Sequence, residues 1–261
     1  MTLFIHELKR SRVSFIVWSI VLSFMLGVCI IIYPEMASQM NEVSDVFANM
    51  GDFSAAFGMD EINFGEFIGY FGIECGNTLG MGGAIFAAIT GISALAKEEK
   101  DRTAEFLLTH PISRSKIVFS KLLSVIAQVL ILNTVIIAVT STCILIIGEQ
   151  TEIKTIALLF LSFLLMQLEI AIITFGLSAF LKRGGFGIGL GLAMTFYFMN
   201  IVSNLTDEIE FLKYFTPFAY ADSAFIIKEQ ALDVKYLLVG LAFSILSIVL
   251  AFIKYNKKDI S

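Results

Sequence analysis

The stretch LLSVIAQVLILNTVIIAVTSTCILIIG at residues 122–148 contains no charged side chain. A helix of roughly 20 apolar residues crosses the hydrocarbon core of a bilayer, so this stretch predicts a transmembrane helix. The rest of the chain has the same character, because 57% of its 261 residues are hydrophobic and only 16% are charged. A soluble domain of this length cannot bury so much apolar surface. The composition therefore indicates an integral membrane protein.

Six apolar runs are long enough to span a membrane, and none of them alternates as the strands of a membrane β-barrel do. They predict an all-α integral membrane protein with a single transmembrane domain over residues 1–261. The first run follows Lys9, Arg10 and Arg12 and is longer than the apolar core of a usual signal peptide, so we expect a retained signal-anchor helix. The expected six transmembrane helices cover approximately residues 15–33, 67–96, 117–148, 155–181, 186–206 and 236–254.

Basic residues are concentrated on one side of the predicted membrane. With six spans, both termini lie on one side, together with the connections after the second and the fourth span. These segments hold most of the 18 Lys and Arg residues. Because cytoplasmic segments are enriched in Lys and Arg, we predict that both termini are cytoplasmic.

The two long external segments differ in composition. The loop at residues 34–66 contains seven acidic residues and no Lys or Arg, which fits either a vestibule that attracts cations or a solvated acidic surface. The region at residues 207–235 gathers aromatic residues around Pro217. Aromatic rings favour the headgroup level of a bilayer, so this region predicts a re-entrant helical piece that dips part-way into the membrane.

Motifs for catalysis, nucleotide binding and metal binding are missing from the sequence. There is no P-loop, no HExxH or Cys/His cluster, and no GxSxG nucleophile elbow. The net charge of −5 argues against nucleic-acid binding. We therefore expect neither an enzyme nor a metal site, and any uphill transport would take its energy from a partner or an ion gradient.

Polar residues within the predicted spans are candidates for a translocation path. Glu169 lies near the middle of the fourth span, and a carboxylate there normally faces protein interior or a water-filled cavity; a transport role and a packing role are both open. Amides in spans also suit interhelical hydrogen bonds. Glycines at every fourth position in the second span predict close helix packing. The path candidates are Glu169, Gln167, Asn133, Glu74, Asn77 and Asn200, and the packing glycines are Gly72, Gly76 and Gly80.

The cytoplasmic segment KEEKDRTAEFLLTHPISRSK at residues 97–116 combines charges with an apolar cluster. Oppositely charged residues four positions apart support a short helix over residues 97–109, which Pro111 ends. Ser113 then offers an N-cap for the next helix. Such a helix beneath the membrane suits either the docking of a soluble partner or a solvated connector.

This segment resembles the signature of type 2 ABC transporter permeases. An acidic stretch, a Thr-x-Glu-x-Leu-Leu core at residues 103–108 and a Pro-x-Ser-Arg turn at residues 111–114 precede Lys121 in the third span. The layout of six spans with re-entrant pieces before the last is also similar. Arg102 departs from the pattern, since the family often has Gly there.

The resemblance implies a division of labour between subunits. A separate ATP-binding cassette ATPase would hold ATP and Mg²⁺ and would dock on residues 97–109 as the coupling helix, while this chain would bind no cofactor. The N-terminal residues would form an amphipathic helix on the membrane surface. A second permease copy or a paralogue would complete the exporter. The complex would lie in a bacterial cytoplasmic membrane, in contact with membrane lipids, and the resemblance does not identify its substrate. The implied docking residues are Glu98, Glu99, Asp101, Arg102, Thr103, Glu105, Phe106, Leu107, Leu108, Pro111 and Arg114.

The sequence alone is also compatible with two other functions. One is a secondary transporter or channel driven by an ion gradient, in which Glu169 or Glu74 titrates; it predicts activity of the purified chain without ATP. The other is a non-transporting membrane anchor, which predicts that substitutions of Glu169 leave partner binding intact. A neighbouring gene that encodes a P-loop would favour the ABC permease.

Overall fold

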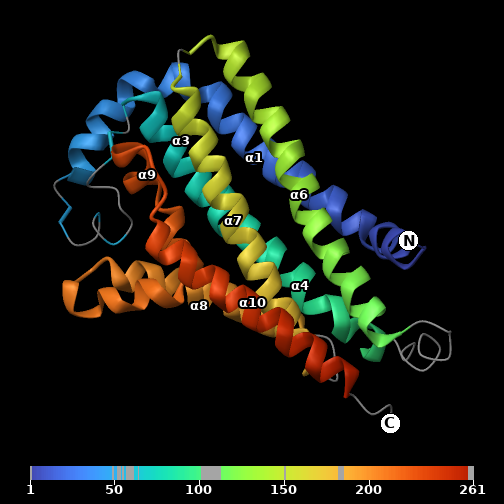
Figure 1. Cartoon of the computed structure of the whole chain (residues 1–261). Helices are drawn as coiled ribbons and strands as arrows, with labels where there is room; N and C mark the ends of the chain where they lie inside the picture. The colour runs from blue at the N-terminus through green and yellow to red at the C-terminus, as the bar shows by residue number, and fades with distance from the viewer. Residues whose placement is uncertain are drawn as a thin grey trace.

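The computed structural model describes residues 2–48, 50–51, 54, 56, 62–63, 65–100, 113–149, 151–181 and 185–257. Over these residues the regular structure is helical, with no strand (Figure 1). Six helical segments in the described part are long and apolar enough to cross a membrane. The predicted all-α architecture with six candidate transmembrane helices is therefore confirmed.

The first helix, α1 (Thr2–Ala48), is longer than the sequence predicts. The N-terminal residues are helical and continuous with it, and the helix continues past Pro34 into the predicted external loop. A proline removes one backbone hydrogen bond and commonly ends a helix, which is why a loop is expected there. Residues 35–48 contain no further Pro and no Gly, so the helix resumes beyond it. The helix bends along its course (Figure 1).

The second membrane segment contains a π-helix that the sequence does not predict. α3 (Phe67–Cys75) leads into the π-helix η1 (Gly76–Gly82), and α4 (Gly83–Lys100) continues the same segment. Glycines within η1 ease the wider turn because they restrict the backbone little. Gln167 donates a hydrogen bond of 2.9 Å from its Nε2 to the Leu79 carbonyl in this turn. The π-helix therefore depends partly on a side chain from another helix.

The third to sixth segments are single helices with recognisable ends. They are α6 (Arg114–Ile147), α7 (Ile153–Ser178), α8 (Phe186–Ser203) and α10 (Val234–Asn256). Ser113 caps α6 by accepting a hydrogen bond from the Lys116 backbone N–H, as the sequence predicts. At the other end of α6, Gly148 adopts a left-handed conformation with φ 73°, which suits glycine.

The region predicted to be re-entrant consists of two 3₁₀-helices, η2 (Asp207–Phe215) and η3 (Pro217–Ala221), followed by the short helix α9 (Ser223–Glu229). All five residues of η3 are buried. Thr216 anchors the start of η3, because its hydroxyl donates to the Phe196 carbonyl of α8 at 2.8 Å. The irregular backbone of η3 is thus covered by protein.

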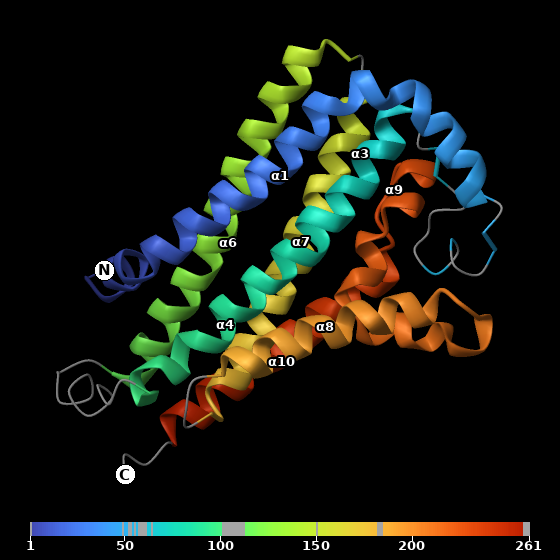
Figure 2. The ribbon, with the colours of Figure 1, turned by 180° about the vertical axis from the view of Figure 1, so that it is seen from behind.

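The helices pack in pairs around α7. α1 lies along α6, and α4 lies along α7. Residues of α7 such as Phe163, Met166 and Phe175 are almost completely buried, whereas α8 and α10 keep exposed apolar faces. Both views place the described ends of the chain, the end of α4 and the start of α6 at the same end of the molecule (Figures 1 and 2). We call this end the loop end; the end of α6 and the start of α3 lie at the opposite end.

Candidate functional site

Most of the predicted docking residues lie outside the described residues. Glu98 and Glu99 belong to the last turns of α4, and Arg114 is the first residue of α6. The remaining docking residues lie in the undescribed segment between these helices: Asp101, Arg102, Thr103, Glu105, Phe106, Leu107, Leu108 and Pro111. The structure therefore describes the two helices that flank the predicted docking segment.

Arg114 connects the start of α6 to the end of α10. Its Nη1 donates a hydrogen bond of 3.1 Å to the Asn256 carbonyl. Ser115 adds a bond of 3.3 Å from its hydroxyl to the side-chain oxygen of Asn256. A cation at a helix C-terminus satisfies a carbonyl without an intrahelical partner and matches the helix dipole. Arg114 thus joins two helices at the loop end.

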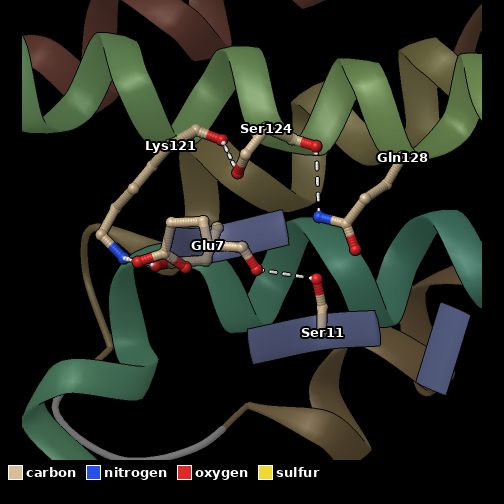
Figure 3. A network of polar contacts seen from close by, with 6 residues as sticks. Glu7, Ser11, Lys121, Ser124 and Gln128 are labelled. Atoms are coloured by element: carbon tan, nitrogen blue, oxygen red, sulfur yellow. Dashed lines mark hydrogen bonds and ion pairs between the residues drawn. The ribbon is translucent and has the colours of Figure 1, made fainter. Parts of the chain in front are cut away.

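The buried side chain of Lys121 joins three helices at the same end (Figure 3). The side chain of Lys121, on α6, is only 1% exposed, and its Nζ lies 3.0 Å from Oε1 of Glu7 on α1. The same ammonium donates to the Ala94 carbonyl of α4 at 2.8 Å. A buried charge is tolerated when it is paired and hydrogen-bonded. Lys121 therefore holds α1, α4 and α6 together within two turns of the end of α4.

Other polar side chains around this ion pair bond within their own helices. The Ser11 hydroxyl donates to the Glu7 carbonyl at 2.9 Å. On α6, the Ser124 hydroxyl donates to the Lys121 carbonyl at 2.8 Å, and Gln128 Nε2 donates to the Ser124 carbonyl at 3.1 Å. These bonds satisfy polar groups of α1 and α6 locally, while Lys121 contacts α1 and α4.

The path candidates do not form one group, and two of them make an amide link between helices. Asn133 on α6 donates to Gln167 Oε1 on α7 at 2.7 Å, and Gln167 donates in turn to the carbonyl of Leu79 in η1. Both amides are buried. This is the interhelical hydrogen bonding that amides provide in membranes.

Glu169 makes a different link, although it is only two residues from Gln167. Positions two apart on a helix face different directions, and Glu169, 7% exposed, accepts a hydrogen bond of 2.7 Å from the Tyr220 hydroxyl in η3. Gly240 of α10 lies directly against this carboxylate and leaves no room for a Cβ atom. Glu169 thus joins α7, η3 and α10.

Asn77 and Asn200 border a cavity of about 100 Å³. Its walls come from α3, η1, α7, α8, η3 and α9, and include Phe163, Tyr197 and Phe218. We call it the outer cavity, because it lies beside the predicted external region. Such a volume holds several water molecules. The two asparagine amides are thus the path candidates that border this space.

Glu74 and the packing glycines occupy other surfaces of the second segment. Glu74 lies beside Cys29 of α1 and Tyr70 of α3. A Cβ at Gly72 would lie 2.7 Å from Ile227 Cδ1 of α9, and one at Gly80 would lie 3.3 Å from Phe163 Cε1 of α7. Gly76 borders the outer cavity and has only the Ser223 hydroxyl within 4 Å. The three glycines therefore differ in how tightly they pack.

The sequence does not predict the partners of the buried charges. Lys121 is placed in the third span from the sequence, and a lysine there requires a partner. Glu7 is the only acidic residue before Glu35, and this is the signal that could have identified it. Nothing in the sequence points to the Ala94 carbonyl, because backbone groups carry no residue signature.

The described residues contain no group of three or more His, Cys, Asp or Glu that could hold a metal ion. The sequence model described as ABC-2 family transporter protein matches residues 1–260, almost the whole chain. No curated protein gives a significant match. The family consists of membrane transport subunits that work with a separate ATPase subunit, in agreement with the six candidate transmembrane helices. The chain belongs to the ABC-2 family of transporter proteins.

Proposed function

We propose that this chain is the permease of a bacterial ABC exporter, forming a dimer with a second copy or a paralogue in the cytoplasmic membrane. A separate ATPase binds ATP and Mg²⁺ and docks on the segment at residues 97–109. The observation that carries this proposal is the linkage of helices at the loop end. Lys121 joins α1, α4 and α6, and Arg114 joins α6 to α10. A push on the segment between α4 and α6 would therefore reach four helices.

The outer cavity suits a part of the translocation path. Asn77 and Asn200 offer amide groups to a passing molecule, while Phe163 and Phe218 offer apolar surface. Phe218 belongs to η3, which Tyr220 anchors to Glu169. We therefore assign Asn77 and Asn200 to the path, and assign Glu169 a positioning role that keeps η3 in place as one wall of the cavity.

The proposal is tested on the complex of the chain with its ATPase in lipid nanodiscs. Glu105→Lys reverses a charge in the predicted docking segment and should weaken co-purification of the ATPase and its stimulation by the permease. Glu208→Lys is the matched control, because Glu208 is exposed in η2, far along the chain from that segment. Normal ATPase binding and stimulation in Glu105→Lys would contradict docking at this segment. Transport by the purified chain in liposomes without ATP would favour the ion-gradient transporter instead.

A further inference from the structure

α1 is fastened at both ends of the bundle. At the loop end Glu7 pairs with Lys121. Farther along, the hydroxyl of Tyr70 on α3 donates to the Cys29 carbonyl at 3.1 Å, and the hydroxyl of Tyr33 donates to the Gly65 carbonyl at 2.9 Å. At 1.5 Å per residue, Glu7 and Cys29 are about 33 Å apart along the helix, roughly the thickness of the hydrocarbon core.

Between these two attachments α1 lies against the second membrane segment. The ring centroids of Trp18 on α1 and Phe86 on α4 are 6.1 Å apart. Leu22 fits against Gly82 of η1 so closely that a Cβ there would lie 2.7 Å from Leu22 Cδ2. Close packing without space to slide makes a helix move as a unit with its neighbour. α1, which packs mainly along α6, therefore also touches the second segment at these two points between the loop end and α3.

The contact between α1 and Tyr70 of α3 lies next to the outer cavity. α3 carries Tyr70, and it also carries Gly72 and Ile73, which line the cavity. The hydroxyl of Ser223 in α9 donates to the Gly72 carbonyl at 2.8 Å, so α9 is fastened to the same turn. A shift of α1 along its axis would thus act directly on a wall of the outer cavity.

From these contacts we infer that Lys121 is a positioning residue through which α1 transmits movement of the loop end to the outer cavity. The ammonium contacts α1 and α4 at once, so a displacement of the end of α4 also displaces Glu7. The inference rests on the proposed function, because it needs an ATPase that moves the docking segment. It adds a second transmission element beside the direct continuation of α4 into η1.

The test measures distances between spin labels in the complex with the ATPase, with and without ATP and vanadate. Cys29, Cys75 and Cys143 are first replaced by alanine. One label pair, at Ile31 of α1 and Phe225 of α9, reports the outer cavity; both side chains are exposed. A second pair, at Arg12 and Phe119, reports whether α1 stays in register with α6; both positions are exposed.

In the wild-type complex we expect ATP and vanadate to shift the outer distance while the inner distance stays constant. The outer label pair should show one distance without nucleotide and another with ATP and vanadate. Lys121→Met should lower the ratio of the second population to the first, in the presence of ATP and vanadate, by roughly two- to thirtyfold, the range for residues that couple two sites. It should also broaden the distribution of the inner distance. Lys116→Met, an exposed lysine on the same helix, should leave both distances as in the wild type.

The double variant Glu7→Met/Lys121→Met separates transmission from stability, because it removes both charges and leaves no unpaired carboxylate. We expect it to assemble normally and to show the same reduced change in the outer distance as Lys121→Met. An outer shift of wild-type size in Lys121→Met or in the double variant would overturn the inference. A wild-type complex that binds its ATPase but shows no outer shift would overturn it as well. Failure of any ATPase to bind the wild-type chain would overturn the proposed function and, with it, this inference.

Discussion

Glu7 and Glu169 are both largely withdrawn from solvent, but the helices satisfy them differently. The side chain of Glu7, 11% exposed, pairs with the ammonium of Lys121, so this link has no net charge. Glu169 accepts its hydrogen bond from a phenol, the hydroxyl of Tyr220, which is neutral. One carboxylate is matched by a charge, and the other by a dipole.

The two links therefore differ in how strongly each holds its helices together. An ion pair that is buried and also hydrogen-bonded costs much free energy to break from one side. A single hydrogen bond contributes far less. The contact that joins α1, α4 and α6 at the loop end therefore includes a charge pair, whereas the polar contact between η3 and α7 is a single hydrogen bond within a buried surface. The stronger polar link lies beside the predicted docking segment, and the weaker one lies within α7.

The largest effect should come from breaking the ion pair on one side. Lys121→Met leaves the Glu7 carboxylate buried without its partner and should lower the free energy of unfolding by about 3–5 kcal/mol. Thermal unfolding of the protein in detergent measures this loss. Lys116→Met removes an exposed charge from the same helix and should change stability by no more than about 0.5 kcal/mol. Equal losses in the two variants would contradict the special role of the buried pair.

A substitution opposite Glu169 should have the next largest effect. Gly240→Ala places a Cβ where the Glu169 carboxylate now lies, so the carboxylate must move away from Tyr220. Such overpacking should cost about 1–3 kcal/mol in thermal unfolding. Gly187→Ala on α8 is the control, because among the described residues no atom from another part of the fold lies within 4 Å of the added Cβ. If Gly240→Ala left the thermal stability unchanged, Glu169 would have room to reorient.

Removal of the phenol hydroxyl tests the weaker link directly. Tyr220→Phe keeps the ring and deletes the donor to Glu169, and it should cost about 1–2 kcal/mol. Hydrogen exchange of the backbone at residues 217–221 should become faster, because η3 loses its anchor on α7. Tyr214→Phe, on an exposed side chain of η2, should leave this exchange unchanged. Unaltered exchange in Tyr220→Phe would mean that packing alone holds η3.

Local composition predicts the helices of this protein well, because apolar length alone decides whether a segment can span a bilayer. The same reasoning misses what other helices impose. The π-helix η1 involves Gln167 from α7, and α1 continues beyond Pro34 although proline commonly ends a helix. Neither effect is visible in the residues of the segment itself.

The polar candidates were found in the sequence, but their grouping was not. Gln167 and Glu169 are two positions apart in sequence, yet Gln167 bonds to α6 and η1, whereas Glu169 bonds to η3 and lies against Gly240 of α10. Which helix each faces depends on the rotation of α7 in the bundle, which tertiary packing sets. The Glu7–Lys121 pair joins residues 114 positions apart, a separation at which a single sequence gives no pairing signal.

Loss of the amide link between α6 and α7 should have the smallest effect on the free energy of unfolding. It gives a reference for the effects of Tyr220→Phe and Lys121→Met. Asn133→Leu keeps the branching and the number of heavy atoms of the side chain and removes the donor to Gln167 Oε1, which should cost about 0.6 kcal/mol, the average for hydrogen bonds between membrane helices. Thr134→Val is the neighbouring control, since the exposed Thr134 hydroxyl bonds to the Leu130 carbonyl of its own helix. Unfolding in detergent should rank Asn133→Leu below Tyr220→Phe and far below Lys121→Met. Asn133→Leu could instead lower the free energy of unfolding more than the other two substitutions. The contribution of each link would then depend on its depth in the bundle rather than on charge. The contrast between Glu7 and Glu169 would lose its physical basis.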